Sequence, residues 1–150
     1  MGISDEAVEV RAQGWRRLAA LHQLIESRLE KALQAEHGLS VVEFTVMDAL
    51  SRQDGWHMRM AQLGRAAGLS PSASTRLVNR LEDRGLLTRI LCADDRRGIY
   101  TELTPAGRAL YERAHPIHDE TLSRVLADAA AQPELAPVVE VLQTAAPQPA

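Results

Sequence analysis

The sequence predicts a mainly helical protein that carries one small β-hairpin. Two long segments, 8–36 and 105–145, place apolar residues at helical spacing. Between them, two shorter helical segments are followed by two strand-like runs, 86–91 and 99–103. A chain of 150 residues is long enough to form one domain whose core needs no disulfide or metal ion. We therefore expect a single domain over 1–150.

The segment 8–36 is predicted to form one long helix. Apolar or amphipathic side chains recur along it at alternating spacings of three and four, at Trp15, Leu18, His22, Ile25, Leu29 and Ala32. At 1.5 Å per residue such a helix is about 40 Å long, more than a small domain covers by folding back on itself. We therefore expect a second copy of the chain to cover this seam, and a loose acidic tail over 1–7.

Start and stop signals place the next elements. Gly38 ends the long helix, and the capping-box sequence 40–43 (Ser-Val-Val-Glu) starts a second helix that runs to about Arg52. The pair 54–55 (Asp-Gly) is typical of a turn, and 56–57 is predicted to be a short strand that joins the hairpin.

The two short helices before the hairpin are predicted to be joined by a tight turn. The first covers 58–68 and stops at its glycine, which favours the left-handed cap conformation. Ser70 and Pro71 then form a strong helix start, and the second helix runs to Arg84, with Gly85 closing it.

The outer face of this second helix suits DNA. With Leu77 at the centre of the buried face and Ala73 and Leu81 beside it, the outward residues are Ser72, Thr75, Arg76, Asn79 and Asp83. Arginine can fork onto guanine, asparagine onto adenine, and small hydroxyls allow close approach to the groove. We expect the DNA-contacting residues to be Ser70, Ser72, Ser74, Thr75, Arg76, Asn79 and Arg80. Arg76 and Asn79 would read bases, whereas Arg80, with Arg84 beside it, would hold phosphate; an ordinary solvated helix face is the alternative.

The hairpin has a charged tip. Its turn contains Asp94, Asp95, Arg96 and Arg97. An arginine held out on a hairpin can enter a minor groove, and a neighbouring aspartate can orient it. Without the preceding helix pair, a merely solubilising turn would be the better interpretation.

These features together resemble the MarR family of winged-helix transcription regulators. The resemblance is carried by the helix-turn-helix, the run 74–87 (Ser-Thr-Arg-Leu-Val-Asn-Arg-Leu-Glu-Asp-Arg-Gly-Leu-Leu), the tip 94–98 (Asp-Asp-Arg-Arg-Gly) and 103–107 (Leu-Thr-Pro-Ala-Gly), and extends loosely over about 10–145. It implies a homodimer that binds an inverted-repeat operator and is commonly released by a small ligand or an oxidant. By position, Arg97 resembles the wing arginine and Asp95 its orienting carboxylate. Arg96 would contact phosphate.

The predicted fold is thus a mainly α winged helix-turn-helix with a small β-hairpin wing at 40–104. Dimerisation helices at 8–36 and 105–145 flank it, with loose tails at 1–7 and 145–150. A dimer of this kind would hold two recognition helices about 34 Å apart, one turn of DNA. A ligand between the helices and the winged segment could change that distance.

The C-terminal segment carries its own signals. Thr104 and Pro105 repeat the cap-plus-proline start, and Gly107 is expected to allow close packing. Pro116 should bend or interrupt the helix, and Pro133 should start a last helix.

The charge distribution supports a DNA partner although the net charge is −3, which taken alone argues against one. Residues 52–113 hold 11 arginines against 7 acidic residues, and the flanking segments are acidic. This modest local excess favours a discrete operator contact. A single cysteine excludes an internal disulfide, and no apolar run matches a membrane span or signal peptide, so we expect a cytoplasmic protein without a membrane partner.

Other residues suggest sensing. Trp15 and His22, with His118, are weak candidates for binding an aromatic or phenolic effector, although core packing explains them more simply. His115 and His118 could share a metal ion if the helix survives Pro116, but too few ligands are in place, so no metal or cofactor is expected.

Three further functions are less favoured: a redox switch, an enzyme and an interaction dimer without DNA binding. Cys92 could be a redox switch because arginines lie nearby, yet a half-buried strand cysteine is the simpler interpretation. No histidine, phosphate-binding loop or paired carboxylates accompany the serines at 70–74, so we expect no enzyme. A helical interaction dimer without DNA binding would not need Arg76 and Asn79. The expected function is a ligand-responsive repressor.

Overall fold

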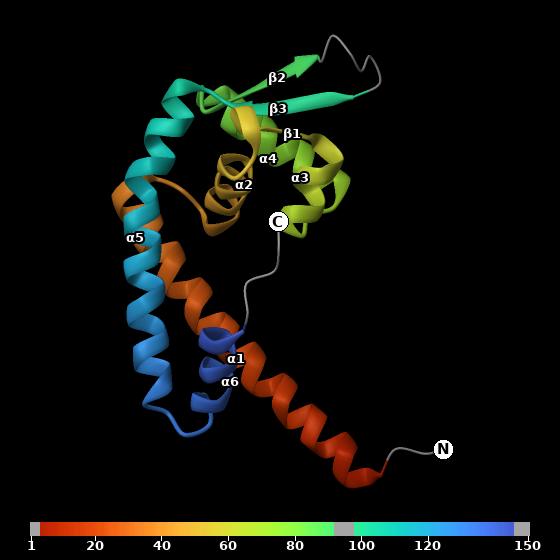
Figure 1. Ribbon diagram of the computed structural model, residues 1–150, viewed down its shortest axis with the longest axis vertical. Helices are drawn as coiled ribbons and strands as arrows, with labels where there is room; N and C mark the ends of the chain where they lie inside the picture. Colours follow the sequence, from red (N-terminus) through yellow and green to blue (C-terminus); the bar gives the residue numbers. More distant parts are fainter. Residues whose placement is uncertain (1–3, 92–97, 146–150) are drawn as a thin grey trace. The chain divides into compact units, whose positions relative to one another are not determined.

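The computed structural model describes residues 4–91 and 98–145 (Figure 1). The chain divides into two compact units. The winged unit comprises 33–117, and the helical unit comprises the described parts of 1–32 and 118–150. Two long helices, α1 (Asp5–His37) and α5 (Pro105–Ala130), contribute residues to both units.

The winged unit contains a three-stranded sheet and three further helices. Its elements between α1 and α5 are α2 (Val41–Ser51), the 3-10 helix η1 (Asp54–Trp56), β1 (His57–Arg59), α3 (Met60–Ala67), α4 (Pro71–Asp83), β2 (Leu87–Leu91) and β3 (Ile99–Leu103). The sheet is antiparallel in the order β1-β3-β2, and Leu87 pairs with Leu103. In Figure 1 the helices α2, α3 and α4 lie on one side of this sheet. The predicted mainly helical fold with a small wing is confirmed.

The first strand lies later in the chain than predicted. Trp56 belongs to η1 instead of a strand, and Met58 and Arg59, predicted as helical, lie in β1. Met58 pairs with Thr101 of β3. This pairing joins residues far apart in the sequence, so it overrides the local helical pattern.

The three predicted glycine stops and the capping box at Ser40 are confirmed. Gly38, Gly68 and Gly85 have φ of 62°, 66° and 73°, the left-handed conformation that favours glycine. At the start of α2, the Ser40 hydroxyl accepts the Glu43 N–H at 3.0 Å, and the Glu43 carboxylate accepts the Ser40 N–H at 2.9 Å. These local hydrogen bonds satisfy donors that the helix leaves free.

The start of α5 packs closely on the end of the α4–β2 turn. The Thr104 hydroxyl accepts the Gly107 N–H at 3.0 Å and donates to the Gly85 carbonyl at 2.6 Å. A Cβ at position 107 would lie 2.1 Å from the Leu86 carbonyl oxygen. The expected close packing at Gly107 is therefore confirmed.

The proline within α5 does not interrupt the helix. α5 runs continuously from Pro105 to Ala130 through Pro116. Pro116 and Glu112, whose carbonyl loses its N–H partner, are both exposed. Water can therefore reach that carbonyl, and the predicted interruption is wrong.

The helical unit has a small core of its own. Its buried cluster consists of Leu21, Ala129, Leu135 and Val139, flanked by Leu24, Ile25, Leu126 and Val138. The last helix, α6 (Ala136–Thr144), begins three residues after the predicted Pro133 start, because the intervening residues form turns.

The N-terminal helix is longer than predicted, and its predicted seam is buried at Leu29 but exposed nearer its start. α1 begins at Asp5 instead of Val8, with acidic residues in its first turn that favour a helix start. Trp15 and Leu18 of the predicted seam are 67% and 46% exposed, whereas Leu21 is buried. None of the described helices is long and apolar enough to cross a membrane.

Candidate nucleic-acid interface

The helix α4 is positioned by a tight turn after α3. The left-handed Gly68 ends α3, and Leu69 donates its N–H to the Gly64 carbonyl at 2.8 Å. The Ser70 hydroxyl then accepts the Ala73 N–H at 3.2 Å, and Pro71 occupies the first turn of α4. Both predicted boundaries of this turn are confirmed.

The buried face of α4 is rotated from its predicted centre. Its buried residues are Ser74, Leu77, Val78 and Leu81. At 100° per residue around the helix axis, the mean direction of these four side chains lies about 50° from that of Leu77. Ala73 therefore lies at the edge of the buried face. Val78, which is fully buried, was missed by the pattern.

Ser74 is not available for DNA contacts. It is 3% exposed, and its hydroxyl donates to the Ser70 carbonyl at 2.9 Å. A Cβ at Gly64 of α3 would lie only 2.7 Å from this hydroxyl, so the two helices meet here. The predicted base or phosphate contact of Ser74 is wrong because the residue packs between α3 and α4.

The other predicted residues of α4 lie on its exposed face. Ser72, Thr75, Arg76, Asn79, Arg80 and Asp83 are all exposed. The Thr75 hydroxyl donates to the Pro71 carbonyl at 3.0 Å, and the Ser70 and Ser72 hydroxyl oxygens lie 3.3 Å apart. The face therefore presents small hydroxyls near its start and cationic or amide groups farther along.

The arginines of the winged unit differ in their partners. Arg84 donates to Glu43 of α2 at 3.4 Å, and Arg108 donates to Glu102 at 3.4 Å. The side chains of Arg76 and Arg80, by contrast, make no hydrogen bond or ion pair with any other residue that the structure describes. A phosphate role for Arg84 is not supported, because its guanidinium is paired with a buried carboxylate; Arg76 and Arg80 remain available.

Arg89 of β2 contacts α4. Its guanidinium donates a hydrogen bond to the Asn79 amide oxygen, and its Nε lies 4.0 Å from a Glu82 carboxylate oxygen. The sequence pattern had placed Asn79 on the outer face without this partner. The periodicity of a helix cannot show which strand residue will lie beside it.

Two grooves lie beside α3 and α4, and the first of them also reaches the sheet. One, of about 440 Å³, is lined by Arg59, Met60, Ala61, Thr75, Arg89, Gly98 and Ile99. The other, of about 360 Å³, is lined by Met60, Ala61, Gly64, Arg65, Leu69, Pro71, Ser74 and Thr75. Arg59, Arg65 and Arg89 are thus cations beside α4 that the sequence analysis did not assign to the interface. The sequence did contain a signal for Arg65. In a helix-turn-helix the first helix crosses the DNA backbone, so an arginine on that helix is a candidate phosphate contact.

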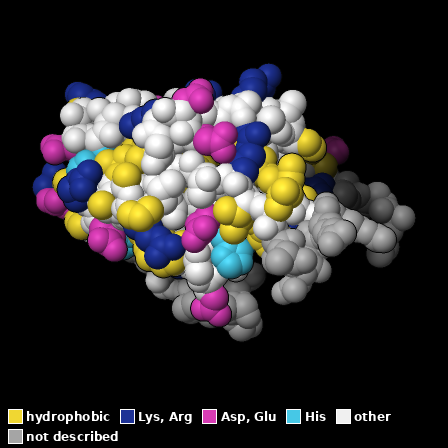
Figure 2. Space-filling model, turned by 90° about the horizontal axis from the view of Figure 1, so that it is seen from above, with side chains coloured by type: hydrophobic (Ala, Val, Ile, Leu, Met, Phe, Trp, Pro, Cys, Tyr) yellow, Lys and Arg dark blue, Asp and Glu magenta, His cyan; other side chains and the backbone are white. Residues whose placement is uncertain are grey.

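The tip of the wing lies outside the described residues. Asp95, Arg96, Arg97 and Cys92 belong to it. On the face seen in Figure 2, Lys and Arg side chains are interspersed with Asp and Glu, and no continuous basic patch forms. The surface therefore matches the modest charge excess of 52–113.

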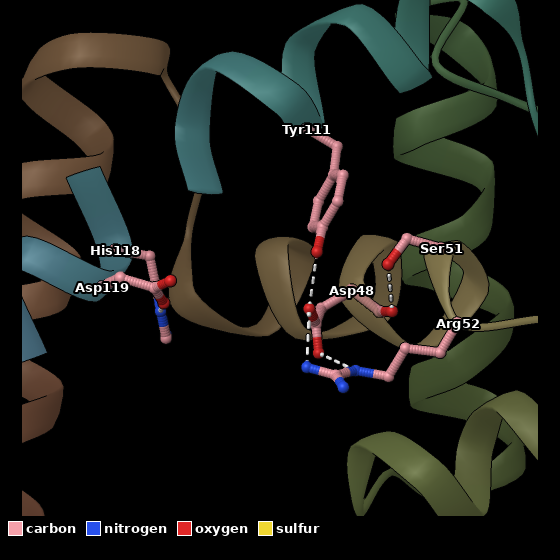
Figure 3. A network of polar contacts seen from close by, with 6 residues as sticks. All are labelled: Asp48, Ser51, Arg52, Tyr111, His118 and Asp119. Carbon is pink, nitrogen blue, oxygen red and sulfur yellow. Dashed lines mark hydrogen bonds and ion pairs between the residues drawn. The ribbon is translucent and has the colours of Figure 1, made fainter. Parts of the chain in front are cut away.

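A polar network supports the winged unit behind α4. In Figure 3 the Tyr111 hydroxyl donates to Asp48 at 2.7 Å, and Arg52 donates to the same carboxylate at 2.9 Å and 3.3 Å. Burial raises the pKa of the Tyr111 phenol above its ordinary value, and the hydrogen bond to Asp48 acts in the same direction. The neutral phenol thus ties α5 to α2.

An aromatic cluster fixes the approach to β1. Trp56 has φ of 58°, a conformation that costs a residue with a side chain about 1 to 2 kcal/mol. The Arg108 guanidinium lies 5.0 Å from the Trp56 ring centroid, and the Tyr111 ring meets the tryptophan edge-on at 6.1 Å. These contacts offset the strain.

The predicted sensing residues have separate surroundings. Trp15 is exposed, and His22 lies 3.7 Å from Glu26, both on α1. His118 hydrogen-bonds with Asp119 at 3.2 Å (Figure 3). Among the described residues, no group of three or more His, Cys, Asp or Glu side chains is placed to hold a metal ion.

Taken together, the two helices with their tight turn, the exposed cationic face of α4 and the antiparallel sheet define a winged helix-turn-helix. A model of the MarR family matches residues 37–98. In this segment the chain is similar to the MarR family.

Similar proteins extend this match. The "HTH-type transcriptional repressor Rv2887" of Mycobacterium tuberculosis is 34% identical over 90 residues, which are 60% of this chain and 63% of that protein, so the match spans less than two thirds of the relative. AbsC, a MarR family transcriptional regulator from Streptomyces coelicolor, is 28% identical with a TM-score of 0.75, over 95% of this chain and 93% of AbsC. Sco3205 from the same organism, solved in complex with DNA, shares the fold at 24% identity and a TM-score of 0.75, over 95% and 87% of the chains.

Proposed function

We propose that this protein is a transcriptional regulator that binds a specific DNA sequence through α4. The observation that carries the proposal is the exposed α4 face, on which Arg76 and Arg80 have no partner among the described residues. An exposed guanidinium without an intramolecular partner can donate to guanine or phosphate without first breaking an ion pair. Ser72 and Thr75 would contact bases or phosphates, Ser70 would hold the helix start near the backbone, and Arg97 of the wing would enter the minor groove, oriented by Asp95.

The regulator acts as a homodimer on an inverted repeat. Support comes from the large apolar side chains that the helical unit leaves exposed, among them Trp15, Leu18, Val141 and Leu142. The dimerisation segments are 8–36 and 105–145. Repression is the direction of control suggested by the names of the relatives, and the crystal structure of Sco3205 with DNA supports an operator as the partner.

An aromatic or phenolic effector would release the DNA. Its proposed contacts are Trp15, His22 and His118, of which Trp15 offers an exposed ring and His22 an imidazole that can hydrogen-bond. The test is operator affinity in the presence of aromatic acids and phenols, with the dimer state followed in parallel. If none of them alters affinity while the dimer stays intact, the effector proposal fails.

The DNA-binding proposal is tested by selecting sequences from random DNA with the full chain, followed by gel shifts across a salt series. We expect a two-fold symmetric site whose affinity falls steeply with salt, because bound phosphates release counterions. Arg76→Ala should weaken binding by about 1 to 3 kcal/mol and blur one position in each half-site.

Arg113→Ala is the matched control for the charge removed. Arg113 is exposed on α5 and also lacks a partner among the described residues, but it is not part of α4. We expect the sequence preference of the Arg113→Ala variant to equal that of the unaltered protein. If Arg76→Ala retained the full sequence preference, Arg76 would not be a base-reading residue; if no sequence were enriched at all, the regulator proposal would fail.

A further inference from the structure

The hydrogen bond between β2 and α4 determines which atoms of Asn79 can face DNA. Asn79 lies on the exposed face of α4, in line with the other residues proposed to enter the groove. Its amide oxygen accepts a hydrogen bond from the Arg89 guanidinium. The side chain is therefore oriented by the strand before any DNA arrives.

The orientation of this amide follows from the chemistry of its partner. A guanidinium has only N–H donors, so it can face the amide oxygen of Asn79 but not the amide nitrogen. Glu82, one turn of α4 beyond Asn79, lies 4.0 Å from the Arg89 Nε. The carboxylate thus also attracts the guanidinium and helps to hold it beside α4.

An asparagine held in this way is turned away from the geometry that recognises adenine through both of its polar atoms. That recognition requires the amide oxygen to accept from adenine N6 while the amide nitrogen donates to N7. Arg89 uses one of the two lone pairs of the oxygen and turns the oxygen toward β2, which leaves the two N–H donors facing a base edge. Such donors suit the keto oxygens of guanine and thymine, and they oppose the amino groups of adenine and cytosine.

We propose that Arg89 is a specificity-determining positioning residue, which makes Asn79 a donor-only reader that selects a keto base at its position in each half-site. The inference rests on the proposed function, and it adds which base class this position prefers. It also assigns to β2 a role in sequence choice that does not require Arg89 itself to touch a base.

The experiment is selection from random DNA with the full-length protein and two variants. Arg89→Met keeps the length of the side chain and removes its donors, so the freed Asn79 oxygen should shift the preferred base from keto to adenine. Asn79→Asp keeps an acceptor for Arg89 and presents a second oxygen to DNA, so the preference should shift to an amino base. Each shift should change the keto-to-amino affinity ratio about tenfold, the scale of one good base contact.

A purely structural role of Arg89 predicts a different result. If the pair only braces β2 against α4, Arg89→Met should weaken binding to all sequences equally and leave the preferred base unchanged, which would overturn the inference. Arg113→Met serves as the control for lost charge and should leave the base preference as it is. Circular dichroism establishes whether the variants are folded. If Arg89→Met does not fold, the base preference of Asn79→Asp tests the inference instead.

The failures of the two proposals are distinguishable. An unaltered protein that enriches a symmetric site with adenine at the Asn79 position supports the regulator and contradicts the donor-only reading. An unaltered protein that enriches no sequence overturns the proposed function, and this inference with it.

Discussion

The winged unit and the helical unit bury their apolar side chains to different degrees. In the winged unit, large side chains of α1, α2, α3, α4 and two strands are almost fully buried, among them Leu33, Met47, Leu63, Leu81, Leu87 and Leu103. In the helical unit only six described apolar residues are buried: Leu21, Leu29, Val125, Ala129, Leu135 and Val139. This unit also carries six of the nine large apolar side chains that are exposed in the described part of the chain.

This difference separates a region whose apolar surface is satisfied within one chain from a region that needs further cover. Exposed apolar area of this kind marks an interaction site more often than a stable monomer surface. Apolar faces with similar sequence patterns can thus be buried in different ways. The apolar face of α4 is buried within one chain, whereas the start of the α1 seam needs a further subunit to cover it.

The largest expected effect concerns the exposed apolar side chains of the helical unit. Leu18→Asp combined with Val141→Asp places two charges on its exposed apolar residues. We expect the dimer dissociation constant to rise at least about a hundredfold, about 2.8 kcal/mol, because a dimer interface would have to bury both charges. Sedimentation velocity across a concentration series measures this.

Leu91→Asp is the control for that experiment. Leu91 is 77% exposed, more than Leu18, but it lies in β2 of the winged unit. The dimer should survive this change. Equal dissociation by the double variant and the control would contradict the assignment of the interface to the helical unit.

An intermediate effect is expected from glycine-to-alanine substitutions in the two long helices. Gly107→Ala should destabilise the fold by about 1 to 3 kcal/mol, because the new Cβ collides with the Leu86 carbonyl, a backbone atom with little freedom to move. Gly14→Ala should stabilise it by about 0.5 to 1 kcal/mol, since a Cβ there meets nothing within 4 Å and alanine favours the helix. Chemical denaturation gives both values, and the same sign for both variants would contradict this contrast in packing.

The smallest effect concerns alkaline pH. The pKa of Tyr111 is raised in the folded protein above the ordinary value of 10.0, so the fold favours the neutral phenol. Its stabilisation is complete below the ordinary pKa and is lost as the pH rises through the folded pKa. Tyr111 lies in the winged unit, so a pH titration above 10.0 should loosen this unit first. Tyr111→Phe should weaken that dependence; an identical alkaline transition in this variant would rule Tyr111 out as its cause.

Much of the winged unit could be predicted because its boundaries depend on local chemistry. The capping box at Ser40 and the glycine at 68 act through residues within one turn of themselves. The sequence therefore contained all that was needed to place them. The same applies to the outer face of α4, whose exposed residues follow from helical geometry once the helix is known.

The predictions that were wrong concern residues whose structure depends on contacts with distant parts of the chain. β1 forms because Met58 meets Thr101, and Ser74 is buried because Gly64 of another helix leaves room for it. The partner of Asn79 likewise comes from β2. Such contacts depend on how elements pack, which a periodic pattern along one helix does not contain.

The exposure of Trp15 gives the molecule an optical property. The chain has two tryptophans, and one lies in each unit: Trp15 on the exposed surface of α1, and Trp56 beneath the Arg108 guanidinium. The indole of Trp15 faces solvent in a single chain, so a subunit that covered it would shift its emission to shorter wavelength. Trp56, in contact with Tyr111, would respond instead to loosening of the aromatic cluster. Fluorescence of single-tryptophan variants can therefore follow assembly and local unfolding as two separate signals.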